Sequence, residues 1–289
     1  MTDQAIRSNL PASSPYLTQA LPDLAAWTRY FRDSEIPVLE KTANELERLR
    51  ADEDAVDAST LGELIQTDPL MTLKVLAHVA GRRRVGADTD TETVTTSLVM
   101  MGISPFFRNF GQQPTVEQQL HDQPEALLAL QELLRRAERA ATFALAFAVH
   151  RGDPDAGVIH QAAFLHDFVE LLMYCHAPTL QLKIRAAQQS DPTLRSVQAQ
   201  RATLNIELDV LRQTLMRLWH LPELLIRISD DSHPDQAIVR NVVLAVRLAR
   251  HTMHGWDNAA IPDDIEDIAR LLNVAPRVAL AFVRKVDHN

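Results

Sequence analysis

The residue types that could support chemistry centre on one adjacent pair, His166 and Asp167. Imidazole and carboxylate groups hold the metal ions of hydrolytic sites, which also leave a position open for water. Successive residues on a helix point about 100° apart, so this pair could bind one ion only with ligands from other helices. The histidines and acidic residues that could complete such a set are His150, His160, Glu170, Asp231 and His233.

Other kinds of active site find less support in the sequence. It contains neither the Gly-x-Ser-x-Gly turn of many serine hydrolases nor the glycine-rich loops that hold nucleotide phosphates. Cys175 is the single cysteine, and because Leu172 and Met173 lie beside it we expect a buried, unreactive thiol. His251 and His254 have the spacing of a metal site on one helix face, but no third ligand lies nearby, so we expect a helix-end location instead.

The composition predicts that helices alone position these side chains. The chain of 289 residues has 8 glycines, fewer than a strand-rich fold needs for its turns. Hydrophobic residues make up 46% and charged residues 23%, which is ordinary for a protein with a buried core. We therefore expect an all-α fold with one large domain or two closely packed ones.

Two helices should form the centre of this fold. No proline or glycine interrupts the chain between Pro124 and Gly152, which predicts one helix of about 27 residues over 124–150. The segment 156–176 is apolar almost all round, which predicts a central helix that carries His166 and Asp167.

Shorter amphipathic segments predict the remaining helices and a division of the chain. They lie at 22–32, 38–49, 61–67, 69–79, 94–101, 180–189, 196–218, 221–229, 236–253 and 263–285, with a short one from Ser104. Asp68-Pro69 is typical of a helix start. Residues 1–19 are polar and predict a flexible tail. An uneven, Gln-rich stretch begins at residue 111, where we place the boundary between an N-terminal subdomain (20–110) and a C-terminal subdomain (111–289).

Several short motifs, taken in order, resemble those of the HDOD domain family. They are Ile36-Pro37-Val38-Leu39, Ile65-Gln66-Thr67-Asp68-Pro69-Leu70, Leu73-Lys74-Val75-Leu76, the helix end from Leu98 to Gly102, Phe164-Leu165-His166-Asp167 and Trp219-His220-Leu221-Pro222. The resemblance covers about residues 22–255. It implies an all-helical fold related to the HD phosphohydrolases, with an N-terminal bundle packed on a degenerate HD-type bundle. It also implies a role in bacterial signal transduction, often linked to two-component or cyclic-dinucleotide pathways.

The sequence departs from the family pattern at positions related to metal binding. Arg136, or Arg135 in the other register, stands where the family often has a histidine. The segment Asp231-Ser232-His233-Pro234 replaces a His-His-x-Pro segment, and Val246 falls near the late helical Asp of active HD enzymes. Because of these departures from the family pattern, we predict no catalytic residue, no bound metal and no cofactor.

Arg136 also suggests which positive charge takes the place of the metal ion that the related enzymes bind. A guanidinium can donate two hydrogen bonds to one carboxylate. We therefore predict that Arg136, or Arg135, pairs with Asp167 or Asp231. The vestigial pocket would then be lined by Arg136, His166, Asp167, Asp231 and His233.

The function that we expect is that of a non-catalytic signalling or interaction module. It would act through contact with signalling proteins, or by sensing a small ligand or cyclic dinucleotide in the vestigial pocket, with a homodimer as one form. The first alternative is a metal-dependent HD-type phosphohydrolase acting on a nucleotide or cyclic dinucleotide. The second is a helical scaffold in which the region around His166 is sealed.

Charge and apolar patterning exclude two kinds of partner. The net charge of -9 argues against nucleic acid, because phosphate binding needs a basic surface. No apolar run reaches the length of a signal peptide or a membrane span, which predicts a cytoplasmic protein without a membrane partner.

Overall fold

A computed structural model describes residues 16–81, 93–191, 193–233 and 235–288, and in these residues the secondary structure is helical. The helices are α1 (Leu24–Asp33), α2 (Glu40–Arg50), α3 (Ala58–Ile65), α4 (Pro69–Gly81), α5 (Val94–Met101), α6 (Ile103–Asn109), α7 (Val116–Gln119), α8 (Pro124–Arg151), α9 (Ala156–Phe164), α10 (Phe168–His176), α11 (Pro178–Ser190), α12 (Ser196–Leu204), α13 (Leu208–Leu218), α14 (Glu223–Ile228), α15 (Ala237–His251), α16 (Ile261–Leu272) and α17 (Pro276–Asp287), with a single 3-10 turn at Glu53–Ala55. Val38 and Thr115 form an isolated parallel bridge. The predicted all-α fold is confirmed.

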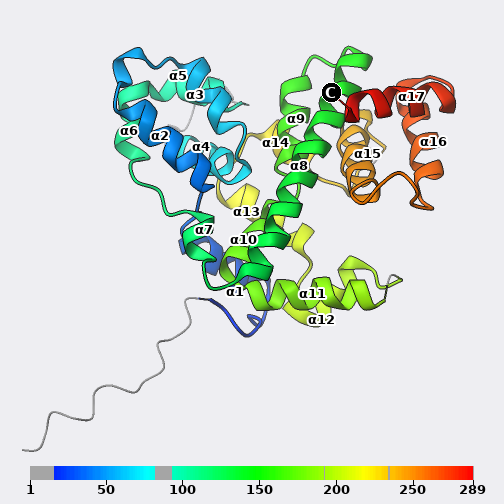
Figure 1. Ribbon diagram of the computed structural model, residues 1–289, viewed down its shortest axis with the longest axis horizontal. Coiled ribbons are helices and arrows are strands. Elements are labelled where there is room, and N and C mark those ends of the chain that lie inside the picture. Colours follow the sequence, from blue (N-terminus) through cyan, green and yellow to red (C-terminus); the bar gives the residue numbers. More distant parts are fainter. Residues whose placement is uncertain (1–15, 82–92, 192, 234, 289) are drawn as a thin grey trace, which may run out of the picture.

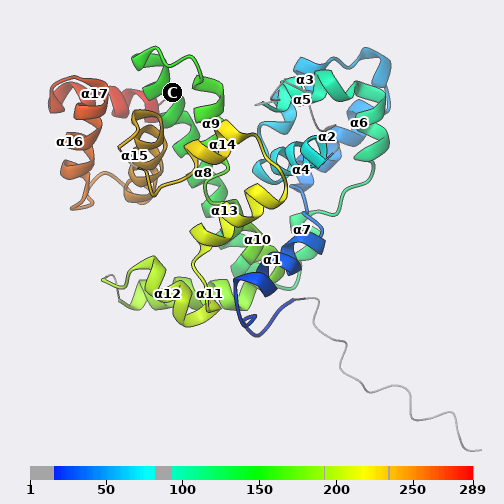
Figure 2. The same ribbon diagram turned by 180° about the vertical axis from the view of Figure 1, so that it is seen from behind.

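The helices gather on the two sides of a central pair, α8 and α9 (Figures 1 and 2). Helices α2 to α6 form the N-terminal lobe, and α15 to α17 lie on the opposite side of α8. Helices α11 and α12 pack at the end of α8 that is distant from α9. One connected apolar core includes residues of both sides.

Helix α8 is the long helix that the sequence predicts, and small residues let its neighbours approach closely. Its buried face is rich in alanine and packs against α9 and α15. Gly152 ends the helix in the left-handed conformation, with a φ of 69° that glycine adopts without strain.

Asp68 fixes the start of α4 and joins it to the entry of α2. Its Oδ1 atom accepts hydrogen bonds from the backbone amides of Leu70 (2.9 Å) and Met71 (3.1 Å), and Oδ2 accepts one from Leu39 (2.8 Å). Burial raises the pKa of the Asp68 carboxyl, although these amide bonds favour its charged form. The predicted helix start at Asp68-Pro69 is confirmed.

The prediction of one helix over 156–176 is wrong, because α9 ends at Phe164 and a turn over 165–167 leads into α10. His166 and Asp167 therefore lie in a turn, and the divergence expected of neighbours on a helix does not apply to them. The sequence offers no proline or glycine to end the helix there. A tertiary contact holds the turn instead, since Arg212 Nη1 donates to the carbonyl oxygen of His166 at 3.0 Å.

Two further long helices, predicted over 196–218 and 263–285, are also divided in the structure. Asn205 (φ 63°) separates α12 from α13, and Asn273 (φ 55°) separates α16 from α17. Asparagine is one of the few residues other than glycine that adopts this left-handed conformation readily.

Helix α1 packs against α13, although it precedes the N-terminal lobe in the sequence. Trp27 is fully buried, and its Nε1 donates to the carbonyl oxygen of Leu204 at 2.9 Å. Of the predicted flexible tail, residues 1–15 lie outside the described residues. Tyr16 is buried, with its hydroxyl 2.7 Å from Asp122 Oδ1. The boundary at residue 110 remains a prediction.

No described helix combines the length and apolar character needed to cross a membrane.

Candidate functional site

Several elements bring charged side chains together at the turn between α9 and α10. Helix α8 contributes Arg136, and the turn contributes His166 and Asp167. Helix α13 contributes Arg212, and the loop between α14 and α15 contributes Asp231. Four of the five predicted site residues meet here, together with an arginine that was not predicted.

Arg136 pairs with Asp167, as one of the predicted alternatives requires. Its Nε and Nη2 atoms donate to Asp167 Oδ2 at 3.1 and 2.7 Å, and Nη2 also donates to Glu170 Oε2 at 3.0 Å. Arg135, the alternative register, is exposed to solvent. Burial opposes the ionisation of Asp167, but the Arg136 charge and the neighbouring His166 outweigh it and lower the pKa of Asp167.

His166 lies between two carboxylates. Its Nδ1 is 2.8 Å from Asp167 Oδ1, and its Nε2 is 3.0 Å from Asp231 Oδ2. Only the imidazolium form has a proton on each nitrogen, so only that form donates to both carboxylates. Burial and the charge of Arg212 lower the pKa of His166, but the two carboxylates outweigh them and the pKa is raised overall.

Arg212 is the ionic partner of Asp231. The residue is buried, and its Nη2 donates to Asp231 Oδ2 at 3.0 Å and to the carbonyl oxygen of Ser229 at 3.1 Å. Burial opposes the charge of Asp231, but hydrogen bonding to His166 and the charges of His166 and Arg212 lower the pKa of that carboxyl.

The charges alternate along this network, which runs from Glu170 through Arg136, Asp167, His166 and Asp231 to Arg212. With His166 protonated, the three cations of this chain of contacts face its three carboxylates, and Arg212 Nη2 also lies 3.6 Å from the exposed Asp209 Oδ1. The buried part of the network is thus electrically balanced, which is the condition under which buried charges are tolerated.

His233 does not join this network. Its side chain is 59% exposed, and its Nδ1 lies 2.9 Å from Ser232 Oγ and 3.5 Å from Asp230 Oδ2. It follows Asp231 by two residues in the α14–α15 loop, and that loop turns its side chain toward solvent.

The other candidate ligands are also dispersed through the fold. His150 lies in the last turn of α8 beside Phe282, and His251 Nδ1 is 2.6 Å from Asp264 Oδ2. Cys175 is buried, and burial raises the pKa of its thiol, as expected for an unreactive cysteine.

The residues of the network do not fit a hydrolytic metal centre. The ring nitrogens of His166 are both engaged by carboxylates, and Arg136 and His166 occupy the oxygens of Asp167. An ion bound to Asp167 would therefore lie against a guanidinium. Within the described ranges, no group of three or more His, Cys, Asp and Glu side chains is arranged to hold a metal ion. Val246 is buried and carries no ligand atom.

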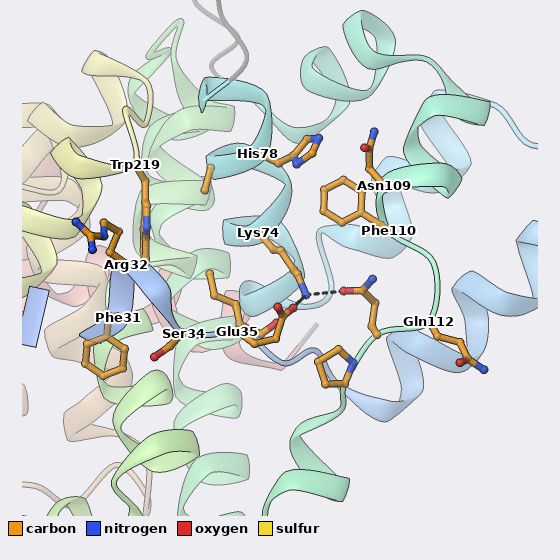
Figure 3. Close-up of a pocket in the computed structure, with 14 residues that line it drawn as sticks. Phe31, Arg32, Ser34, Glu35, Lys74, His78, Asn109, Phe110, Gln112 and Trp219 are labelled. Atoms are coloured by element: carbon orange, nitrogen blue, oxygen red, sulfur yellow. Dashed lines mark hydrogen bonds and ion pairs between the residues drawn. The ribbon is translucent and has the colours of Figure 1, made fainter. Parts of the chain in front are cut away.

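A separate groove of about 630 Å³ lies between the N-terminal lobe and the end of α13 (Figure 3). Trp219 and Arg32 line one side, and His78, Asn109 and Phe110 line the other. The ammonium group of Lys74, in its middle, is already bound to Glu35, to the Ile36 carbonyl oxygen and to Gln113. Its charge is therefore used within the protein and is not available to a ligand.

The helical lobes and the ion-paired His166–Asp167 turn define a multi-helical, all-α protein with a buried charge network. The model of the family described as "HDOD domain" matches residues 36–234, which is more than half of the chain. The chain belongs to the HDOD family. The family resemblance drawn from the sequence is confirmed.

Solved structures share this fold at low sequence identity. The MmoQ response regulator from Methylococcus capsulatus str. Bath is 18% identical with a TM-score of 0.64, and the match covers 87% of this chain and 98% of that one. A virulence factor from Campylobacter jejuni subsp. jejuni is 16% identical with a TM-score of 0.62, over 87% of this chain and 90% of that one. Among curated proteins, none matched the sequence.

Arg212 is the site residue that sequence reasoning missed, although a signal for it exists. Leu208, Leu211 and Leu215 form the apolar face of α13, and Arg212 lies on that same face. A charged residue inside an apolar face must find a partner when the face is buried. That pattern predicts a buried ion pair, but it does not name the partner, which lies in a loop after the next helix.

Proposed function

We propose that this chain is a non-catalytic HDOD module that acts in signal transduction through contact with other proteins or through a small ligand. The observation that carries the proposal is the 2.7 Å contact between Arg136 Nη2 and Asp167 Oδ2. A fixed guanidinium supplies the positive charge that Asp167 needs, so that carboxylate has no further requirement for a cation. The response-regulator name of the MmoQ structure supports a role in signalling.

The competing function is metal-dependent hydrolysis of a phosphoester. It would require His166 to lose a proton and turn a nitrogen toward an ion, and Arg136 to leave Asp167. The network opposes both changes, because each would leave a buried carboxylate without its partner. A sealed scaffold is less favoured than a ligand-responsive module, because a cavity of about 290 Å³ reaches the side chains of Arg136 and Glu170.

Metal analysis and a hydrolysis assay test the non-catalytic proposal. The protein would be purified without chelator, measured for Fe, Mn and Zn by mass spectrometry, and then incubated with Mn²⁺ and cyclic di-GMP or ATP. We expect substoichiometric metal and no turnover, while an active HD phosphohydrolase assayed in parallel hydrolyses its substrate. Stoichiometric metal together with turnover would establish the phosphohydrolase alternative instead.

We further propose that the protein works in the cytoplasm and that its partners are signalling proteins or a second copy of the chain. Light scattering coupled to size exclusion distinguishes a monomer from a homodimer. Cross-linking in the cytoplasm of the producing cell, followed by identification of the attached peptides, tests the protein partner. Recovery of the chain only in a secreted fraction would contradict the proposed location.

A further inference from the structure

A cavity of about 290 Å³ is lined by Arg136 but not by His166. Side chains of α8, α10, α11 and the end of α15 form its walls. Arg136, Glu170, Gln181, Arg185 and Arg250 are among the residues that line it. Its volume is at the small end of the range for ligand sites, which suits a metabolite rather than a macromolecule.

The cations in this cavity outnumber its carboxylates. Arg185 pairs with Glu132, and Arg136 binds Glu170 through Nη2 at 3.0 Å. Arg250 makes no hydrogen bond or ion pair within the described part of the chain, although its charge acts on Asp167. One guanidinium therefore remains available to an anion from outside.

The guanidinium group of Arg136 has one edge that binds no other residue of the described chain. Its Nε and Nη2 atoms are used on Asp167 and Glu170, whereas Nη1 donates to no acceptor among the described residues. The same side chain thus contacts the buried network with one edge and lines the cavity with the other. A guanidinium in this position can bind an anion without giving up its existing partners.

Gln181 adds an unused acceptor to the cavity wall. The residue is 2% exposed, and its Nε2 donates to Glu170 Oε1 at 3.1 Å. Its Oε1 is buried and accepts no hydrogen bond within the described residues. The amide cannot be reversed, because its oxygen would then face the carboxylate of Glu170. Leaving such a buried acceptor unpaired is unfavourable, so a hydroxyl or amine of a ligand would be bound favourably there.

We propose that this cavity binds a small anionic metabolite that carries a phosphate or carboxylate and at least one hydroxyl group. The anion lies against Arg250 and the Nη1 edge of Arg136, and the hydroxyl donates to Gln181 Oε1. The inference rests on the proposed function, because it names the class of ligand to which a non-catalytic module responds. Since Arg136 also holds Asp167, the ligand contacts the buried ion-pair network through that one side chain.

Binding is tested on the full chain by isothermal titration and thermal shift at constant ionic strength. The probes are glycerol 3-phosphate, glycerate and AMP, with glycerol as the uncharged control. We expect saturable binding of at least one anionic probe, an increase in the melting temperature, and no effect of glycerol. Glycerate and glycerol 3-phosphate distinguish a carboxylate ligand from a phosphate ligand.

Two matched variants locate the bound probe. Arg250→Ala should raise the dissociation constant about tenfold or more, because it removes a charged hydrogen-bond donor. Arg277→Ala removes the same charge from an exposed position on α17, outside the lining of the cavity, and should leave the affinity unchanged. Both side chains are exposed, so both variants are expected to fold.

The proposal is overturned if no anionic probe binds, or if Arg250→Ala and Arg277→Ala weaken binding equally. A colorimetric assay for inorganic phosphate in the glycerol 3-phosphate mixture with Mn²⁺ distinguishes this failure from that of the proposed function. An intact probe that does not bind contradicts the ligand site alone. Release of inorganic phosphate contradicts the non-catalytic proposal, whatever the affinity.

Discussion

Arg136 and His166 stabilise Asp167 with two different kinds of charge. A guanidinium stays protonated at every pH at which proteins fold, so the contribution of Arg136 is constant. An imidazole carries its charge only below its own pKa, so the contribution of His166 changes with pH. The two contributions can therefore be measured separately, one by substitution at fixed pH and the other by titration.

Replacing Arg136 with alanine should destabilise the folded protein strongly. The variant leaves Asp167 and Glu170 partly buried without their shared cation, and breaking a buried pair in this way costs about 3 kcal/mol or more. Urea unfolding at neutral pH measures the difference. The exposed neighbour Arg135→Ala is the control and should change the free energy of unfolding by less than about 0.5 kcal/mol. Equal effects of the two variants would show that the network contributes nothing to stability.

His166 should make the stability of the protein depend on pH. Its pKa is raised in the folded state, so its contribution is complete below the unfolded pKa of about 6.5 and is lost as pH rises through the folded pKa. His166→Gln lacks this dependence. The free energy of unfolding of the wild type should therefore fall relative to the variant as pH increases from about 6 to 9.

The difference between the two curves is the quantity to examine, because other histidines act in the opposite direction. Burial lowers the pKa of His160 and of His176, so these residues destabilise the protein as pH falls. Their effect is common to the wild type and to His166→Gln. Parallel curves for the two proteins would show that His166 is not held as an imidazolium.

Helix ends marked by proline or glycine were predicted well. The ends at Asn205 and Asn273, and the end that a tertiary contact holds at His166, were not. Helix α8 is bounded by Pro124 and Gly152, and both residues act locally. The turn at His166 has no such signal, because Arg212 holds it from α13. The same distinction explains the candidate site: the pairing of Arg136 was predicted from its position in the family pattern, but the partner of Asp231 depends on how distant helices pack.

Asn273 ends α16 through its own left-handed backbone conformation, so a residue that adopts this conformation poorly should destabilise the protein. An alanine with a φ of 55° costs about 1–2 kcal/mol, whereas glycine adopts that angle freely. Asn273→Ala should therefore lower the melting temperature, and Asn273→Gly should leave it unchanged or raise it. Thermal unfolding followed by circular dichroism compares the two. An increase in helix content for the alanine variant would indicate that α16 and α17 have fused.

The sequence predicts the helices and the family, but not which distant helices pack against each other. Composition and periodicity predict an all-helical protein, and the ordered motifs predict its family. The predicted boundary at residue 110 assigns α1 to an N-terminal subdomain, and α1 packs on α13, which lies beyond that boundary in the sequence (Figure 2). Amphipathic spacing shows that Trp27 and Phe31 are buried, but not which helix covers them.

Hydrogen exchange should therefore assign α1 to the helices with which it folds. Trp27→Ala removes a large, fully buried side chain, at a cost of about 3–5 kcal/mol, together with its bond to the Leu204 carbonyl oxygen. We expect exchange to increase mainly in α12 and α13, and less in α3 and α5. Leu98→Ala, a buried position on α5, is the matched control and should increase exchange in α3 and α5 instead. If Trp27→Ala loosened α3 and α5 while α13 stayed protected, α1 would belong to the N-terminal lobe, as the sequence boundary implies.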